Sequence, residues 1–144
     1  MSVVIREARL ADAERLAELM PQLGYVIAPA RLADKIADFS KSQSDAVFVA
    51  ELDGNLVGFI SCHLTPLFHQ AGNSGRITSL LVEQSVRNKG IGRLLVTEAE
   101  AFFISQKCVK FEVTSGLQRS ETHRFYQTLG YQADNFRFAK FYRD

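Results

Sequence analysis

Two runs of strand-forming residues, 46–52 and 55–64, are separated only by the dipeptide Asp53-Gly54. An Asp-Gly pair favours the two-residue turn of a β-hairpin, because that turn needs a positive φ at both of its positions. The sequence therefore predicts an antiparallel hairpin in the middle of the chain. This hairpin excludes a wholly parallel sheet, since it places two antiparallel strands side by side.

The segments around this hairpin alternate between strand and helix patterns. Alternating apolar and polar residues predict strands over residues 3–9, 76–82, 108–114 and 136–142. Apolar residues at helical spacing predict helices over residues 13–23, 29–40, 90–105 and 119–129. The resulting order combines hairpins with strand–helix crossovers, which predicts an α/β or α+β fold with a mixed sheet.

Length and charge limit the kinds of partner. A chain of 144 residues suits one domain with one core, and we expect residues 1–144 to form a single domain. The formal net charge of +1 provides no global basic field, so we predict no nucleic-acid partner and no anionic membrane partner. The longest apolar stretch, residues 56–64, is too short to span a bilayer, and residues 1–12 lack the layout of a secretion signal. We therefore expect a cytoplasmic protein.

The cysteine and histidine residues show no spacing typical of a metal site. Cys62 and Cys108 lie in predicted strands and are expected to be core thiols rather than disulfide partners. His63 follows Cys62 directly, so the two side chains point to opposite faces of a strand, while His69 and His123 lie apart. We predict no metal. The sequence also lacks the nucleophile motifs that would indicate a covalent acyl-enzyme.

The most informative segment lies between the strand ending near Val82 and the helix starting near Gly90. It contains two glycines, Gly90 and Gly92, together with the cationic residues Arg87, Lys89 and Arg93. The N-terminus of a helix has unpaired N–H groups and partial positive charge, and glycine lets a phosphate approach them. A pyrophosphate would fit here; a glycine-containing turn with solvated cations is the alternative.

Two nucleotide-binding motifs are excluded at this segment. A P-loop needs Lys followed by Ser or Thr after its second glycine, and none follows Gly92. The dinucleotide-binding fingerprint needs Gly or Ala at position 95, where this chain has Leu95.

Four segments together resemble the GNAT superfamily of acyl-CoA-dependent N-acyltransferases. The family signature is Arg or Gln, two residues, Gly, one residue, and Gly or Ala, which is matched by Arg87-Asn88-Lys89-Gly90-Ile91-Gly92. Residues 123–131 resemble the family's late helix, residues 5–8 with Asp12 resemble its opening, and residues 49–58 resemble its central hairpin. The resemblance covers essentially the whole chain in the same order.

The resemblance implies a mixed, mostly antiparallel sheet of about six to seven strands flanked by about four helices. It implies acetyl-CoA as the co-substrate, with the backbone of Leu80, Leu81 and Val82 pairing with its pantetheine arm. It also implies that the loop holds the pyrophosphate through its backbone amide groups, over Arg87, Asn88, Lys89, Gly90, Ile91, Gly92 and Arg93. The side chains of Lys89 and Arg93 could also reach a phosphate, or be solvated. Arg119, where relatives often have Asn, would contact CoA or cap the late helix.

The resemblance further places Tyr126 where it would protonate the departing CoA thiolate. A phenol of pKa about 10 can serve as a general acid toward a thiol of pKa about 8.5. In an arbitrary protein the same residue would be a core aromatic with its hydroxyl at the edge. Attack of a neutral amine on the thioester would also need an oxyanion donor, such as a backbone N–H near Leu81.

The general base is the point at which this sequence departs from the family pattern. Many relatives have a carboxylate on the strand before the glycine loop, but this strand offers Thr78 and Ser79, which are not bases near neutral pH. Glu112 on the next strand resembles the base of other relatives. The alternatives for the base are His69, in the loop before Arg76, and a chain of water molecules.

We therefore expect an N-acetyltransferase that transfers the acetyl group of acetyl-CoA directly to a primary amine of a small molecule. The alternatives are an acyl-CoA sensor without turnover and an enzyme that acetylates a protein N-terminus or lysine. Residues 20–44 and 64–75, which would form the acceptor surface, carry the least motif content. The aromatic run of Phe136, Phe138, Phe141 and Tyr142 also suggests a homodimer.

Overall fold

The computed structural model describes residues 2–114, 120–133 and 138–142. The chain divides into two compact units, residues 1–114 and residues 115–144. We call them the N-terminal and the C-terminal unit and describe each by itself. Arg119 and Phe136 lie outside the described residues.

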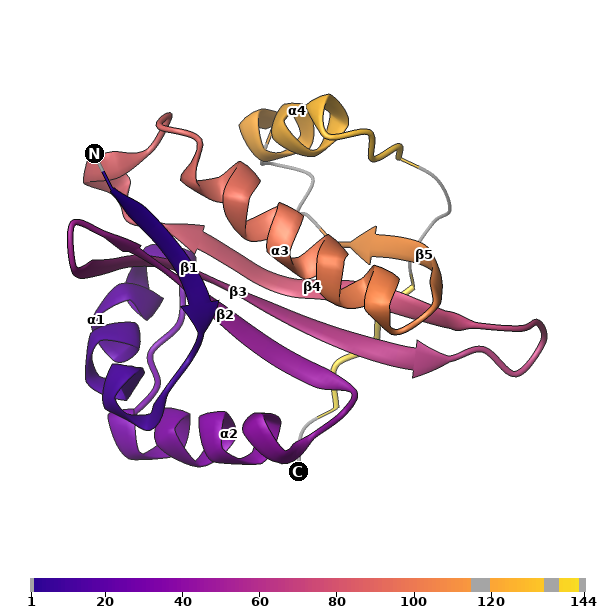
Figure 1. The fold of residues 1–144 in the computed structure, drawn as a ribbon, viewed down its shortest axis with the longest axis horizontal. Helices are drawn as coiled ribbons and strands as arrows, with labels where there is room; N and C mark the ends of the chain where they lie inside the picture. The colour runs from indigo at the N-terminus through magenta and orange to yellow at the C-terminus, as the bar shows by residue number, and fades with distance from the viewer. Residues whose placement is uncertain (1, 115–119, 134–137, 143–144) are drawn as a thin grey trace. The chain divides into compact units, whose positions relative to one another are not determined.

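The N-terminal unit is built on a five-stranded sheet whose strands lie in chain order, β1-β2-β3-β4-β5 (Figure 1). Neighbouring strands from β1 to β4 are antiparallel, whereas β4 and β5 are parallel. The predicted mixed, mostly antiparallel sheet is thus confirmed. The strands are β1 (Val3–Glu7), β2 (Asp45–Leu52), β3 (Asn55–Pro66), β4 (Asn73–Val82) and β5 (Cys108–Val113).

The helices agree closely with the sequence prediction. In the N-terminal unit, α1 spans Ala13–Leu23, α2 spans Pro29–Lys41 and α3 spans Ile91–Ser105. Short 3-10 turns, η1 (Leu10–Asp12) and η2 (Gln84–Val86), precede α1 and the glycine loop. The C-terminal unit contains α4 (Ser120–Thr128). No helix in these described ranges is both long and apolar enough to cross a membrane.

The sheet of the N-terminal unit is covered on both faces. Val49, Phe59 and Leu81 face α1 and α2, where they form a buried cluster with Leu16 and Leu19. Adjacent residues of a strand point to opposite faces, and the ring of Phe48 accordingly packs edge-on against Phe102 of α3. Helices α1 and α2 therefore cover one face of the sheet, and α3 covers the other.

The predicted hairpin is confirmed. Asp53 and Gly54 have φ values of 52° and 87°, the left-handed conformation that a two-residue turn requires. The turn fixes Leu52 opposite Asn55, and pairing continues as far as Asp45 opposite His63.

Two parts of the strand prediction need comment. The sequence predicts this strand only from residue 76, but β4 already begins at Asn73, because Gly75 allows the ring of Phe103 to lie directly against the strand. The predicted strand over 136–142 is not seen in residues 138–142, where Phe138, Phe141 and Tyr142 are exposed. Alternation predicts a strand only where a neighbouring strand supplies hydrogen bonds. The expected six to seven strands are therefore not confirmed among the described residues.

Candidate active site

The central feature of the site is a β-bulge in β4. Ser61 of β3 pairs with Ser79, whereas the next residue, Cys62, pairs with Ile77, so Thr78 is an extra residue on β4. Pairing between β4 and β5 extends only from Asn73 to Ile77 and thus ends immediately before the bulge.

Beyond the bulge, residues 78–82 have no strand partner on the β5 side among the residues that the structure describes. A strand edge of this kind presents free N–H and C=O groups to which an extended molecule can add. Leu80, Leu81 and Val82, the predicted pantetheine contacts, lie in this segment. Leu81 is buried against α1, whereas Leu80 and Val82 are half-buried.

The glycine loop follows β4 and is tied back to it. The Nε atom of Arg87 donates a hydrogen bond to the carbonyl oxygen of Val82 at 2.9 Å. Asn88 and Gly90 have φ values of 66° and 82°, so two residues of the loop adopt the left-handed conformation before α3 begins. A side chain at Gly90 would be strained by this φ, although a Cβ there would meet nothing within 4 Å.

The start of α3 is open to an anion. Gly90 is the N-cap of α3, and no described side chain caps this end of the helix. The first-turn N–H groups, those of Ile91, Gly92 and Arg93, are consequently available, and the helix dipole favours negative charge there. Arg87, Lys89 and Arg93 have exposed side chains around these amides, while Ile91 is buried and anchors the helix.

A hydrogen-bonded chain of polar side chains lies on the sheet face opposite to α3. Asp45 Oδ1 is 2.7 Å from Nδ1 of His63, and Nε2 of His63 is 2.7 Å from Oγ1 of Thr78. Thr78 Oγ1 is 2.7 Å from Oγ of Ser61, which also hydrogen-bonds Oγ of Ser79. The bulge makes this possible, since Thr78 and Ser79 both reach Ser61.

The sequence alone does not predict this network of hydrogen-bonded side chains. The sequence patterns give His63 no role beyond that of a metal ligand, which its spacing excludes, and they give none to Asp45 or Ser61. The available signal was the opposite orientation of Cys62 and His63: with Cys62 fully buried, His63 had to point to the other face. The chain's partners come from three strands, so their proximity depends on register.

Asp45 is held in its ionised form by its neighbours. Its hydrogen bond with His63 is the main cause that lowers the pKa of the carboxyl group, and a hydrogen bond from Ser42 at 2.8 Å adds to it. Burial acts in the opposite direction but does not prevail. Because an ionised carboxylate only accepts hydrogen bonds, Nδ1 of His63 must carry the proton. In the neutral imidazole Nε2 is then an acceptor for the hydroxyl of Thr78.

Glu112, a predicted base, lies on β5 opposite Arg76 of β4. Its Oε1 accepts a hydrogen bond from Oγ of the buried Ser74 at 2.8 Å, and Nζ of Lys110 is 3.6 Å from its Oε2. His69, the alternative base, is exposed in the loop between β3 and β4.

Tyr126 lies on α4 in the C-terminal unit and is 6% exposed. Its ring packs against those of Phe125 and Tyr131, with centroid distances of 5.2 and 5.6 Å. Burial raises the pKa of the phenol to about 12. Tyr126 is therefore a protonated hydrogen-bond donor over the whole physiological range.

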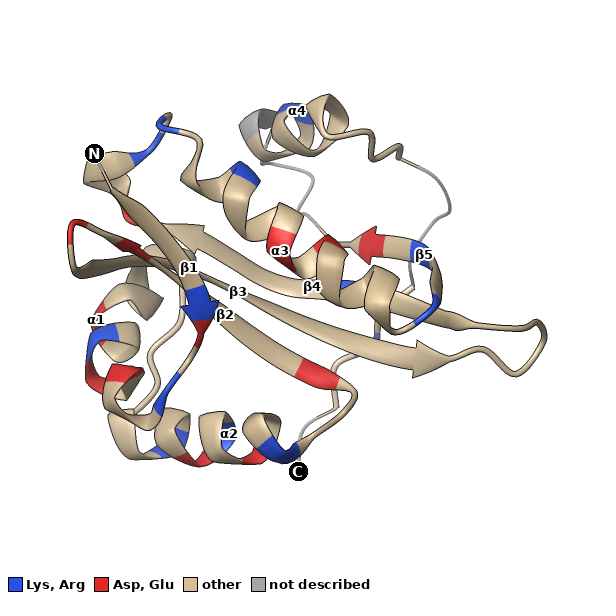
Figure 2. Ribbon diagram, viewed as in Figure 1, with Lys and Arg blue, Asp and Glu red and all other residues tan. Residues whose placement is uncertain are grey.

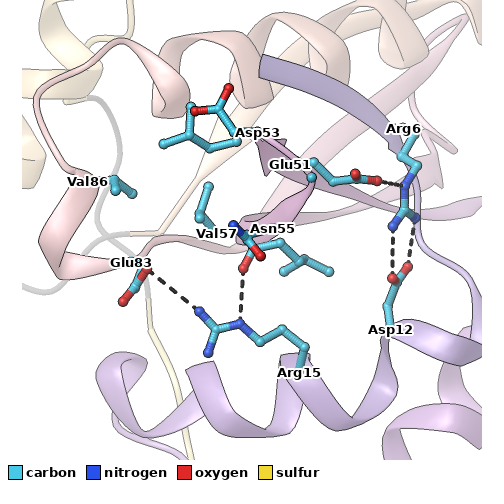
Figure 3. Close-up of a pocket in the computed structure, with 12 residues that line it drawn as sticks. Arg6, Asp12, Arg15, Glu51, Asp53, Asn55, Val57, Glu83 and Val86 are labelled. Atoms are coloured by element: carbon cyan, nitrogen blue, oxygen red, sulfur yellow. Dashed lines mark hydrogen bonds and ion pairs between the residues drawn. The ribbon is translucent and has the colours of Figure 1, made fainter. Parts of the chain in front are cut away.

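A separate cavity of about 600 Å³ lies at the hairpin end of the sheet (Figure 3). Several of its charged groups are paired with one another, among them Arg15 and Glu83, whose Nη2 and Oε2 atoms are 3.6 Å apart. Arg6 binds both oxygens of Asp12, at 2.8 and 2.9 Å, and also binds Glu51. Arg15 donates to the carbonyl oxygen of Leu56 at 3.1 Å. These contacts fasten η1 and α1 to the sheet, and we assign the cavity a structural role.

The charges show no large basic field. Lys and Arg residues are interspersed with Asp and Glu residues along α1 and α2 (Figure 2). In the described part of the chain, no group of three or more His, Cys, Asp or Glu residues could hold a metal ion.

The fold of the chain and its strand, glycine loop and helix define a mixed α/β protein of the GNAT type. The sequence profile of the acetyltransferase (GNAT) family matches residues 12–131, and the chain belongs to this family. The matched region spans both compact units.

Among characterised relatives, the chain is 34% identical over 88 residues to an aminoalkylphosphonate N-acetyltransferase of Salmonella typhimurium. The match covers 61% of this chain and only 57% of that relative. It is 26% identical over 138 residues to a glucosamine 6-phosphate N-acetyltransferase of Trypanosoma brucei brucei, covering 91% of this chain and 92% of the relative.

Solved structures support the fold. A glucosamine-6-phosphate N-acetyltransferase from Arabidopsis thaliana superposes with a TM-score of 0.87 at 19% identity, covering 99% of this chain and 100% of that chain. A transcriptional regulator from Bacillus halodurans gives the same TM-score of 0.87 at 23% identity, covering 98% of this chain and 100% of that chain. At such identities, the likeness concerns the fold alone.

Proposed function

We propose that this protein is an N-acetyltransferase that transfers the acetyl group of acetyl-CoA to a primary amine of a small molecule. Family membership supports the reaction class, because the matching profile is that of acetyltransferases. The two named relatives both act on small molecules that carry an amine together with a phosphonate or phosphate group. We therefore expect the acceptor to be of similar size.

One observation carries the proposal. Within the described residues, the edge of β4 at residues 78–82 has no strand partner, and the glycine loop leads from it to the start of α3, where no side chain caps the helix. Acetyl-CoA has a matching order of groups, with a thioester, an extended amide-containing arm and a pyrophosphate. In our proposal the amides of the arm pair with residues 80–82. The pyrophosphate then accepts hydrogen bonds from the amides of Ile91, Gly92 and Arg93. This arrangement directs the thioester toward the bulge at Thr78.

The chemistry that we propose is direct attack of the neutral amine on the thioester carbonyl. A backbone N–H near Leu81 donates to the carbonyl oxygen as negative charge develops there. Tyr126 donates a hydrogen bond to the departing thiolate. Because its pKa is about 12, Tyr126 is a weaker acid than an ordinary thiol, whose pKa is about 8.5. We therefore expect it to stabilise the thiolate by hydrogen bonding rather than by complete proton transfer.

The test is release of CoA thiol from acetyl-CoA in the presence of a panel of amines. The panel contains an aminoalkylphosphonate, glucosamine 6-phosphate, a peptide with a free N-terminal amine and a peptide with an internal lysine. We expect turnover with a small amine and formation of its N-acetyl product by mass spectrometry. Turnover confined to the peptides would favour a protein acetyltransferase. Binding of acetyl-CoA by calorimetry without turnover on any amine would favour the sensor function.

A further inference from the structure

We infer that His63 is the proton acceptor of the transfer reaction, reached from the substrate amine through the hydroxyl groups of Ser79, Ser61 and Thr78. Asp45 is its positioning residue. This inference rests on the proposed acetyltransferase function and names the group that removes the amine's proton.

The hydrogen bonds of this chain can all run in one direction. Nδ1 of His63 donates to Asp45 at 2.7 Å, which leaves Nε2 to accept from Oγ1 of Thr78, also at 2.7 Å. Oγ1 of Thr78 accepts from Ser61 at 2.7 Å, and Ser61 accepts from Ser79. Every hydroxyl donates once and accepts once, except that of Ser79, which has an accepting position left for a proton from the substrate.

The hydrogen-bonded network of hydroxyl groups also begins where the proposed reaction would take place. Ser79 and Thr78 lie at the bulge, where pairing of β4 with β5 has just ended. In the proposed complex the thioester lies at this point. Thr78 is exposed and the side chain of His63 is 27% exposed, so the chain is open both to an acceptor and to solvent.

The charged groups around His63 come from three strands. Asp45 of β2 contacts it directly, Arg76 of β4 is its partner in register, and Glu112 of β5 is the partner of Arg76. The guanidinium of Arg76 donates to Oγ1 of Thr114. From α2, the uncharged ring of Phe39 packs edge-on against the imidazole at 5.6 Å between centroids. The carboxylate of Asp45 thus faces Nδ1 of His63, and the hydroxyl of Thr78 faces Nε2.

The proton balance is as follows. The amine nitrogen bonds to the thioester carbon, and its proton passes to Ser79 while one hydroxyl proton moves along each link, so that Nε2 of His63 receives the last one. The C–S bond then breaks and the thiolate departs, hydrogen-bonded by Tyr126. Asp45 remains ionised throughout. The imidazolium returns its proton to solvent through its exposed edge.

The first experiment measures kcat/KM against pH with acetyl-CoA and the best small amine of the panel, for the parent and for His63→Gln. Gln can form hydrogen bonds but cannot take up the proton, so we expect a loss of ~100-fold. Protonation of the substrate amine lowers the rate of both proteins at acid pH. The parent should therefore show a limiting slope of about two in log(kcat/KM), and the variant a slope of about one, because only one ionisation remains.

Three further variants locate the path of the proton. Thr78→Val should lower kcat by a similar factor, and the double variant His63→Gln/Thr78→Val should be little worse than either single variant, since both interrupt one path. Asp45→Asn should lower kcat less than His63→Gln does, whereas the matched change Asp38→Asn at an exposed position of α2 should leave kcat unchanged. The CoA affinity and the urea midpoint of each variant report whether it is folded.

A second measurement does not depend on turnover. Nitrogen-15 NMR of the imidazole of His63 should show a proton on Nδ1 and none on Nε2 in the neutral form, and Asp45→Asn should disturb this tautomer. The opposite tautomer in the parent overturns the inference.

The kinetic outcomes separate this inference from the proposed function. A parent that turns over no amine defeats the proposed function, and the inference fails with it. An active parent whose pH slope is unchanged in His63→Gln overturns the inference alone. In that case, loss of the slope in Glu112→Gln or in His69→Gln would identify the acceptor instead.

Discussion

The side chain of Arg87 bonds through Nε to the carbonyl oxygen of Val82, five positions earlier in the chain, at 2.9 Å. This contact fixes the start of the glycine loop against the end of β4. The contact draws the glycine loop back toward the strand, and Gly90, the N-cap of α3, follows three residues after Arg87. In the proposed function, this contact sets the path of the loop along which the pyrophosphate of acetyl-CoA would bind.

The glycine loop provides the first prediction. Gly90→Val, alone or together with Gly92→Val, should lower the affinity for CoA at least ~10-fold in calorimetry, because a side chain would occupy the open space above the helix start. Gly24→Val is the matched control: Gly24 also has a positive φ, 102°, and open space around its Cβ position. It should pay the same backbone strain and keep its CoA affinity. Equal losses in both variants would contradict the phosphate assignment.

The second prediction concerns Tyr126. Tyr126→Phe should lower kcat by ~100-fold while leaving the affinity for acetyl-CoA nearly unchanged, because the ring packing is kept and only the donor is lost. Tyr142→Phe, at an exposed position, is the control. Since the pKa of Tyr126 is about 12, its deprotonation should cause no decline of kcat at any pH below about 11. Full activity of Tyr126→Phe when chemistry limits the rate would exclude this role.

The third prediction concerns stability in acid. The hydrogen bond from Arg6 is the main cause that lowers the pKa of Asp12 below its ordinary value of 3.8. This contribution to stability is fully present above that value and is lost as the pH falls below it, through the lower pKa of the folded state. Urea unfolding should show Asp12→Asn about 1.5–3 kcal/mol less stable than the parent at pH 6. The difference should shrink toward pH 2, whereas Asp34→Asn at an exposed position should show none.

Much of the fold could be predicted because its signals are local. The Asp53-Gly54 turn, the helix starting after Gly90 and the helix beginning at Pro29 each depend on a few adjacent residues, and each is confirmed. The glycine loop was found in the same way. The start of β4 at Asn73, three residues before the predicted start at 76, could not be predicted because it depends on Phe103, which is distant in the sequence and packs on Gly75 in the structure.

The polar chain could not be predicted for a related reason. Asp45, His63 and Thr78 are separated by long stretches of sequence and meet only through strand register. The bulge that brings Thr78 and Ser79 together inserts one residue into the alternation of β4. Alternation read from the sequence assigns these two neighbours to opposite faces.

Gly75 leads to the fourth prediction. A Cβ added there would lie 2.8 Å from Cε1 of Phe103, and even closer to other atoms of the ring. Gly75→Ala should therefore destabilise the protein by about 1–3 kcal/mol in urea unfolding. The double variant Gly75→Ala/Phe103→Leu tests the cause, because the smaller side chain removes the overlap; the second change should then cost less in the Gly75→Ala background than in the parent.

The fifth prediction is a homodimer. Phe138 and Phe141 are 94% and 90% exposed, and exposed aromatic side chains near each other commonly mark an interface. Sedimentation at micromolar concentration should give the mass of a dimer, and Phe138→Ser/Phe141→Ser should shift it toward that of a monomer. A monomeric mass for the parent would remove the proposal.

The chain-order arrangement of the strands has a consequence for folding. Each strand from β2 onward pairs with the strand made just before it, and the bulge at Thr78 arises where β4 pairs with β3. The loops that join β2 to β3 and β3 to β4 are short, and closing a short loop costs little entropy. We therefore expect the strand register that brings Asp45, His63 and Thr78 together to form early once the chain is made, and to need neither β5 nor the helix that carries Tyr126.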